Sequence, residues 1–161
     1  MKKTKLIYLF LVFAFFTACK GKTTETPPKQ QTATEEVKEE QVVEGGDLNS
    51  FFPKEQAGFS IVFTQEKDGF AQADLKKDGQ AVATLAVSDV ANNSSAVAKF
   101  AKSTAKLAGY PLTKSGGKGT VILVADKYQV QVRSISNDFT EAMRKEWIEK
   151  FNLSGLSKLK K

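Results

Sequence analysis

The chain has 161 residues and a formal net charge of +6 at pH 7, with 24 lysines and arginines, 18 acidic residues, one cysteine and no histidine. This composition excludes Ser-His-Asp and Cys-His catalytic groups, zinc sites of the usual His/Cys kind, and an intramolecular disulfide. We therefore expect one domain that has no catalytic residues, binds no metal or cofactor, and is stabilised by its hydrophobic core.

The first predicted element is a signal peptide over residues 1–18. Lys2, Lys3 and Lys5 precede an unbroken apolar run at 6–16, and small residues follow that run. This order of basic, apolar and small residues is typical of secretory signal peptides. The apolar run is too short for a membrane-spanning helix, which takes about 20 residues.

The segment Phe16-Thr17-Ala18-Cys19 ends in the only cysteine of the chain. It resembles the lipobox of bacterial lipoproteins, although Phe16 stands where leucine is usual. The resemblance implies cleavage before Cys19, acylation of this residue with fatty acids such as palmitate, and firm attachment through two or three acyl chains. An incidental cysteine would leave a lone thiol in an oxidising compartment, and an uncleaved anchor would need a longer apolar span. We therefore prefer the lipoprotein interpretation.

Lys20 follows the cysteine in place of the aspartate that, in enterobacterial lipoproteins, typically favours retention in the inner membrane. We therefore expect a lipoprotein of a bacterial cell envelope, anchored in the outer membrane and facing the periplasm. The expected partners are the membrane, through acylated Cys19, and an envelope protein or an anionic polymer. A nucleic acid is not an expected partner in that location.

Residues 19–46 are predicted to form the lipidated start of the mature chain and a disordered linker. They are rich in lysine, threonine, glutamate, glutamine and proline, and they contain few large apolar residues. A flexible chain of this length has a root-mean-square span of roughly 25–30 Å, which holds a domain clear of the membrane. Glutamates outnumber lysines in this linker, so the excess positive charge lies in the predicted domain at 47–161.

The predicted domain opens with Phe51-Phe52-Pro53, which either covers one end of a sheet or forms an exposed apolar patch for a partner. We favour the covering role. Three strands are predicted next, at 59–64, 70–76 and 81–88, and in the first of them apolar and polar residues alternate. Asp78-Gly79 supplies the positive φ angles of a tight hairpin turn, so the strands are expected to form an antiparallel meander.

A helix is predicted next, from an N-cap at Asn93, Ser94 or Ser95 to Gly109, with Pro111 just beyond its end. The spacing of the apolar residues between these limits places them on one face, which we expect to pack on the sheet. The residues of this face are Val97, Phe100, Ala101, Thr104, Leu107 and Ala108.

The rest of the chain is predicted to form three strands and a final helix. The strands are expected at 111–114, 120–125 and 128–133, with turns at 115–119 and 126–127 between them.

Asp138 and Glu141 have the spacing of a capping box at the start of the final helix. Trp147 lies on the apolar stripe of this helix, where core packing is its expected role. The stripe and the looser turn that continues it consist of Phe139, Met143, Trp147, Phe151, Leu153, Leu156 and Leu159.

The resulting order, β-β-β-α-β-β-β-α, predicts an α+β domain in which an antiparallel sheet of about six strands has two main helices packed on one face. This layout resembles the fold shared by the photosystem extrinsic subunit PsbP and its relatives, which are mostly assembly or stabilising factors. The resemblance rests on layout without a specific motif, so it implies little about function.

Two patterns suggest catalytic or phosphate sites, and we reject both. Residues 115–120 fail as a phosphate-binding loop, because a glycine separates lysine from threonine and a strand follows where a helix is needed. Asp74 and Asp89 are the carboxylates nearest to strand interiors or ends, and a glycosidase needs two acids about 5 to 10 Å apart. A domain of this size has little room for a deep cleft, so we do not expect an enzyme.

The expected function is that of a non-catalytic, lipid-anchored module that binds or stabilises an envelope partner. The alternative is an inhibitor or scavenger that binds an anionic ligand through Lys99, Lys102, Lys106, Lys114 and Lys118. The first three share one face of the predicted helix, and the other two lie at the glycine-rich turn. A solvated face opposite a core stripe predicts the same helix lysines and is the simpler interpretation.

Overall fold

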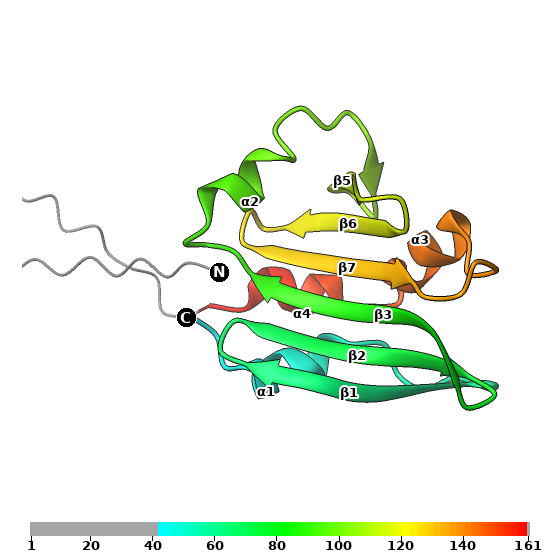
Figure 1. The fold of residues 1–161 in the computed structure, drawn as a ribbon. Helices are drawn as coiled ribbons and strands as arrows, with labels where there is room; N and C mark the ends of the chain where they lie inside the picture. The colour runs from blue at the N-terminus through cyan, green and yellow to red at the C-terminus, as the bar shows by residue number, and fades with distance from the viewer. Residues whose placement is uncertain (1–41, 161) are drawn as a thin grey trace, which may run out of the picture. The chain divides into compact units, whose positions relative to one another are not determined.

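Seven antiparallel strands form the central sheet of the computed structural model, which describes residues 42–160 (Figure 1). The predicted signal peptide, Cys19 and nearly all of the predicted linker lie outside the described residues. The order across the sheet is β1-β2-β3-β7-β6-β5-β4. The strands are β1 (Phe59–Lys67), β2 (Phe70–Lys77), β3 (Gln80–Asp89), β4 (Lys106–Leu107), β5 (Tyr110–Ser115), β6 (Gly119–Val124) and β7 (Tyr128–Ser134).

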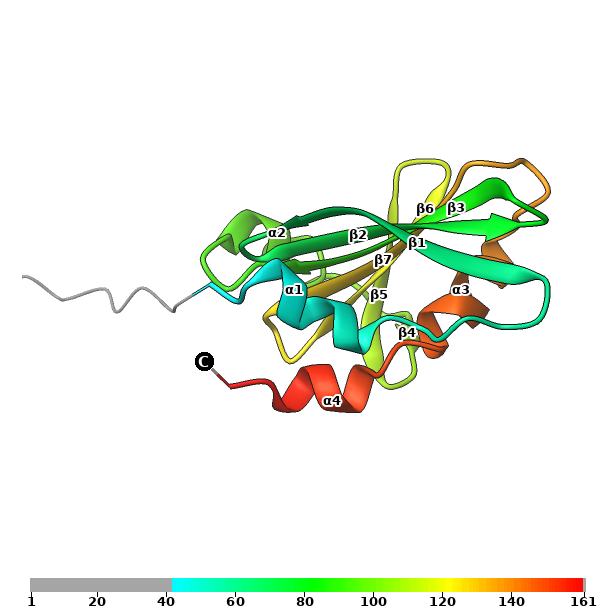
Figure 2. The same ribbon diagram turned by 90° about the horizontal axis from the view of Figure 1, so that it is seen from below.

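Short helices cover one side of this sheet. The described chain contains α1 (Gly45–Leu48), the 3-10 turn η1 (Asn49–Phe51), α2 (Ser94–Ala98), α3 (Glu141–Glu149) and α4 (Leu153–Lys158). Figure 2 shows α1, α3 and α4 on the same side, which we call the helix-covered face. We call the opposite side the open face. The architecture is therefore α+β with an antiparallel sheet, as predicted.

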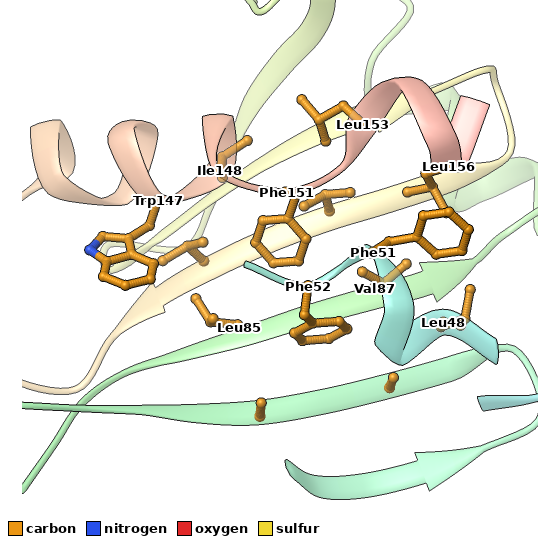
Figure 3. Close-up of a cluster of buried hydrophobic side chains, with 14 of the residues drawn as sticks. Leu48, Phe51, Phe52, Leu85, Val87, Trp147, Ile148, Phe151, Leu153 and Leu156 are labelled. Carbon is orange, nitrogen blue, oxygen red and sulfur yellow. The ribbon is translucent and has the colours of Figure 1, made fainter. Parts of the chain in front are cut away.

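The main core fills the space between the sheet and the helices of the helix-covered face (Figure 3). Leu85 of β3 and Ile148 of α3 are completely buried there. The ring of Phe52 lies 5.0 Å from the ring of Phe63 and 5.1 Å from that of Phe151, so the segment before β1 contacts both the sheet and the segment after α3. Burial of a large apolar side chain of this kind stabilises the fold by about 1.5–3 kcal/mol.

The segment Phe51-Phe52-Pro53 is buried, which confirms its predicted covering role over that of an exposed patch. Trp147 is 3% exposed, and its ring lies 5.2 Å from the ring of Phe59, so its predicted core role is also confirmed. Packing begins before the expected domain start at residue 47. Val43 is fully buried, and a Cβ on Gly45 would come within 2.5 Å of the Lys67 backbone, so no larger residue fits there.

A second, smaller cluster lies on the open face at the β6 end of the sheet. Val121 and Leu123 of β6 face it, whereas their neighbours in the strand face the main core, because successive side chains of a strand alternate. Phe100 covers these residues from the segment that follows α2. Gln129 of β7 fixes α2 in place: its Nε2 donates to the Ala96 carbonyl at 2.9 Å. The predicted placement of both main helices on one face is therefore wrong.

The predicted helix from Asn93 to Gly109 is also wrong beyond its first turn. Asn93 is the N-cap, and its Oδ1 accepts from the backbone N–H of Ala96 at 3.0 Å, but α2 ends at Ala98. Residues 103–107 form hydrogen bonds with β5 in place of the hydrogen bonds that would continue the helix. The Ser103 hydroxyl donates to the Leu112 carbonyl, the Leu112 N–H donates to the Ala105 carbonyl at 3.0 Å, and the chain then pairs with β5 as strand β4.

β4 is the strand that the sequence pattern does not reveal, which makes the sheet one strand larger than expected. The glycine expected to end the helix occupies the β4–β5 turn instead, where Ala108 and Gly109 both have positive φ angles.

The N-cap of α3 also differs from the prediction. Thr140 Oγ1, not Asp138, accepts the Met143 N–H, at 3.4 Å, because the chain turns at 136–139 to bury Phe139.

The β2–β3 hairpin has the predicted two-residue turn. Asp78 and Gly79 have φ angles of 50° and 80°, and Lys77 pairs with Gln80. A bulge follows in β3, because Leu75 pairs with Ala83 and Lys76 with Ala81, which leaves Val82 without a partner in β2.

The Val82 carbonyl accepts hydrogen bonds from the N–H groups of Ile135 and Ser136, at 2.9 and 3.0 Å. The bulge therefore fastens the start of β3 to the segment that connects β7 with α3.

Candidate functional site

A pocket of about 450 Å³ lies on the helix-covered face at the end of the sheet marked by the β2–β3 hairpin. The start of β1, the bulge of β3, the β7–α3 connection and the first turn of α3 surround it. Its volume falls in the range of about 300–1,000 Å³ that is usual for ligand pockets. The lining residues are Phe59, Lys77, Asp78, Gln80, Val82, Ser136, Asp138, Phe139 and Met143. We call it the hairpin pocket.

The floor of the hairpin pocket is apolar. Phe59 is the first residue of β1 and packs edge-on against Trp147, which fixes its ring at the margin of the core. Val82 stands in the bulge, and Met143 is a partly buried residue of α3. Phe139 closes the floor and is itself buried. These four side chains offer contact area to an apolar group of a ligand.

The rim of the hairpin pocket is polar and carries both signs of charge. Asp78 and Gln80 come from the hairpin, and Asp138 comes from the β7–α3 connection. The Lys77 ammonium lies 5.9 Å from the centroid of the Phe59 ring, within cation–π range. Asp138 donates its backbone N–H to the Ser136 hydroxyl at 3.2 Å, which orders the connection beside the pocket. An apolar floor beneath two carboxylates and one ammonium suits an apolar side chain flanked by a basic group.

The helix that was expected to align Lys99, Lys102 and Lys106 on one face ends at Ala98, so that helical face does not form. Lys99, Lys102 and Lys106 lie in and around the segment between α2 and β4, and Lys102 is not helical. Lys114 lies in β5, and Lys118 lies in the β5–β6 turn.

Lys99, Lys114 and Lys118 have polar partners. The Lys99 ammonium donates to Gln129 Oε1 at 2.9 Å and lies 5.3 Å from the Phe100 ring centroid, and its partial burial lowers its pKa. The Lys114 ammonium lies 3.2 Å from Glu141 Oε2, and that of Lys118 donates to Asn137 Oδ1 at 2.9 Å.

Asp74 and Asp89 do not form a carboxylate pair. Asp74 pairs with Thr84 in the sheet register and projects from the open face. Asp89 lies five residues beyond Thr84 in β3, which is roughly 16 Å along the strand. The alternation of side chains along β3 places it on the helix-covered face. Its Oδ1 accepts the Ala91 N–H at 3.0 Å, which is a local turn contact. The two-carboxylate arrangement considered from the sequence is therefore not present at these residues.

The turn at 115–119 is a hairpin between β5 and β6, as predicted, and Gly116 has a φ angle of 64°. Among residues 42–160, no group of three acids, histidines or cysteines is close enough to hold a metal ion. Nor does this part of the chain contain a helix long and apolar enough to cross a membrane.

Comparison with known protein families, with curated proteins and with solved structures finds no match. The resemblances to bacterial lipoproteins and to the PsbP layout therefore stay predictions.

Proposed function

We propose that this protein is a non-catalytic lipoprotein of the bacterial envelope that holds its domain at the membrane and binds an envelope protein through the hairpin pocket. The observation that carries the binding part is the apolar floor of the pocket beneath a charged rim. The proposed occupant is an extended segment of the partner that presents a large apolar side chain beside a lysine or arginine.

The membrane part of the proposal rests on the N-terminal sequence. A basic start, an apolar run and a lipobox-like segment precede Cys19, and acylation of that residue would provide permanent attachment. The polar residues that follow offer the length to present a domain at a distance from the lipid surface. Outer-membrane location on the periplasmic side remains part of the proposal.

The chemistry of the pocket supports a peptide segment as its ligand. Phe59, Val82 and Met143 supply contact area without any group that reacts, and a buried apolar anchor is the usual energetic centre of a protein interface. Asp78 and Asp138 place two negative charges on the rim against the single positive charge of Lys77. That balance favours a cationic residue next to the anchor.

Membrane attachment is tested with Cys19→Ser. We expect the variant to lose incorporation of a labelled palmitate analogue and to move from the membrane fraction to the soluble fraction. A variant that stays in the membrane fraction would contradict the lipoprotein part of the proposal.

Partner binding is tested by filling the pocket with Val82→Phe and by reversing a rim charge with Asp138→Lys. Val62→Phe on the open face and Glu149→Lys at the end of α3 are controls with the same changes elsewhere. Proteins that co-purify with the wild type from solubilised membranes should decrease at least about tenfold with the two pocket variants, as expected for a lost anchor, and stay constant with the controls. Equal recovery with all four variants would contradict the proposal.

A further inference from the structure

Arg144 is a buried cation without an anionic partner among the described residues. Its side chain is 6% exposed and lies between α3 and the sheet. Nε donates to Thr120 Oγ1 at 2.9 Å, and Nη1 donates to Ser134 Oγ at 2.8 Å. Both acceptors are neutral hydroxyls. The third nitrogen, Nη2, makes no hydrogen bond within the described chain.

The position of Arg144 in its helix makes this arrangement more costly. Arg144 follows the N-cap residue Thr140 by only four positions. The beginning of a helix carries the positive end of the helix dipole, which stabilises anions and destabilises cations. A buried charge is ordinarily paired with an opposite charge, because neutral hydrogen bonds do not replace its lost hydration. An anion beside Arg144 would therefore stabilise the buried charge, and no described residue supplies one.

A second cavity, of about 330 Å³, opens beside this guanidinium. It lies between the β5–β6 turn and the β7–α3 connection. Besides Arg144, its lining includes Lys118 from the turn and the hydroxyl-bearing Ser136 from the connection. The Lys118 ammonium donates to Asn137 Oδ1 at 2.9 Å, which holds this exposed lysine at the cavity. Two cationic side chains and a hydroxyl thus face one small volume.

Glu141 also lines this cavity, but lysines already balance its charge. Its Oε1 lies 2.9 Å from the Lys145 ammonium, and its Oε2 lies 3.2 Å from that of Lys114. Hydrogen bonds from Lys145 and Lys114 lower the pKa of Glu141, so the carboxylate is occupied by these two partners. Arg144 and Lys118 line the cavity together with this one carboxylate, which Lys114 and Lys145 already pair, so the local excess of charge is positive.

We propose that this cavity binds an oxyanion, the carboxylate or phosphate group of a small ligand. Arg144 Nη2 and the Lys118 ammonium are the charged donors, and the Ser136 hydroxyl is a neutral donor. Thr120 and Ser134 orient the guanidinium, since each fixes one of its other nitrogens. Planar guanidinium groups held in this way are well suited to oxyanions. This site adjoins the hairpin pocket, with which it shares Ser136 and Phe139, but its two charged donors do not line that pocket.

The test is isothermal titration calorimetry of the full chain in detergent with inorganic phosphate and, separately, with acetate at low ionic strength. We expect binding of at least one of these anions, and phosphate without acetate would assign the ligand group as a phosphate. Arg144→Gln and Lys118→Ala should each weaken binding about tenfold or more, as expected for loss of a charge-assisted hydrogen bond. Lys102→Ala, an exposed lysine away from the cavity, is the matched control.

Lys118 is exposed on a turn, so its variant keeps the fold even if Arg144→Gln does not. The proposal is overturned if neither anion binds at about 10 mM, tenfold above a millimolar dissociation constant. It is also overturned if Lys118→Ala binds as tightly as Lys102→Ala does. Since the hairpin pocket lacks both Arg144 and Lys118, these outcomes leave the partner-binding proposal unaffected.

Discussion

The helix-covered face and the open face of the sheet differ although the same strands form both. On the helix-covered face, Leu85 and Ile148 are fully buried. On the open face, Val62 is 42% exposed, and Thr84 and Gln72 remain partly accessible. Both cavities lie on the helix-covered face where the cover by α3 begins, at the β7–α3 connection. The main core and both proposed binding sites are therefore on one side of the sheet.

The largest effect should separate two adjacent residues of β3. Leu85→Ala removes a fully buried side chain from the main core and should lower the free energy of unfolding by about 2–5 kcal/mol. Thr84→Ala changes the open face and should stay within about 0.5 kcal/mol. Urea unfolding of the full chain measures both. If the two substitutions cost the same, the assignment of the two faces is wrong.

A smaller difference is expected between two helix caps. Asn152 Oδ1 accepts the Gly155 N–H at 3.0 Å at the start of α4, which buries Leu153 and Leu156. Asn93 has the same role in α2, which buries none of its own residues. Loss of an N-cap costs about 0.5–2 kcal/mol. Asn152→Ala should lower the global free energy of unfolding by about that amount, because α4 is part of the main core.

Asn93→Ala should instead change local stability. We expect faster hydrogen exchange at the amides of α2 and little change in the global unfolding midpoint, because α2 can open without exposing the main core. If Asn93→Ala lowered the global free energy of unfolding as much as Asn152→Ala, α2 would contribute to global stability as much as α4 does, which would contradict this expectation.

The smallest effect concerns the ion pairs of Glu141 at the edge of the second cavity. Lys145 and Lys114 hold its pKa below the ordinary value of 4.5. A lowered pKa in the folded state stabilises the fold above the unfolded-state pKa, and this contribution is lost as the pH falls through the lowered value. Glu141→Gln should therefore lower the melting temperature slightly at neutral pH. The difference from the wild type should shrink progressively below pH 4.5. A difference that grows on acidification would contradict this account.

Local signals in the sequence were sufficient for much of the sheet. Asp78-Gly79 determines its own turn geometry, and Tyr128, Val130 and Val132 alternate with polar residues as a strand with one buried face requires. The prediction of a long helix after Asn93 was wrong, because the sequence did not show a partner strand for this segment. Its apolar spacing was real, but Leu107 packs in the main core from a strand, and the partner that makes it a strand is Tyr110.

The cavities could not be predicted because they depend on contacts between distant segments. Val82 enters the hairpin pocket through a bulge that is fixed by the backbone N–H groups of Ile135 and Ser136. Arg144 did leave a signal that helical spacing could have shown. It precedes Trp147 by three positions and Ile148 by four, so it lies beside the buried stripe, where an arginine needs a partner. The identity of that partner is determined by β6 and β7.

The most direct measurement of the central claim, that binding occurs at the helix-covered face, is photo-cross-linking in intact cells. A photoreactive amino acid is placed at Gln80 on the rim of the hairpin pocket or at Val62 on the open face; both side chains are exposed. We predict a discrete cross-linked protein with Gln80 that disappears when Val82→Phe is added, and none with Val62. Cross-linking from Val62 alone, or from Gln80 regardless of Val82→Phe, would contradict the account.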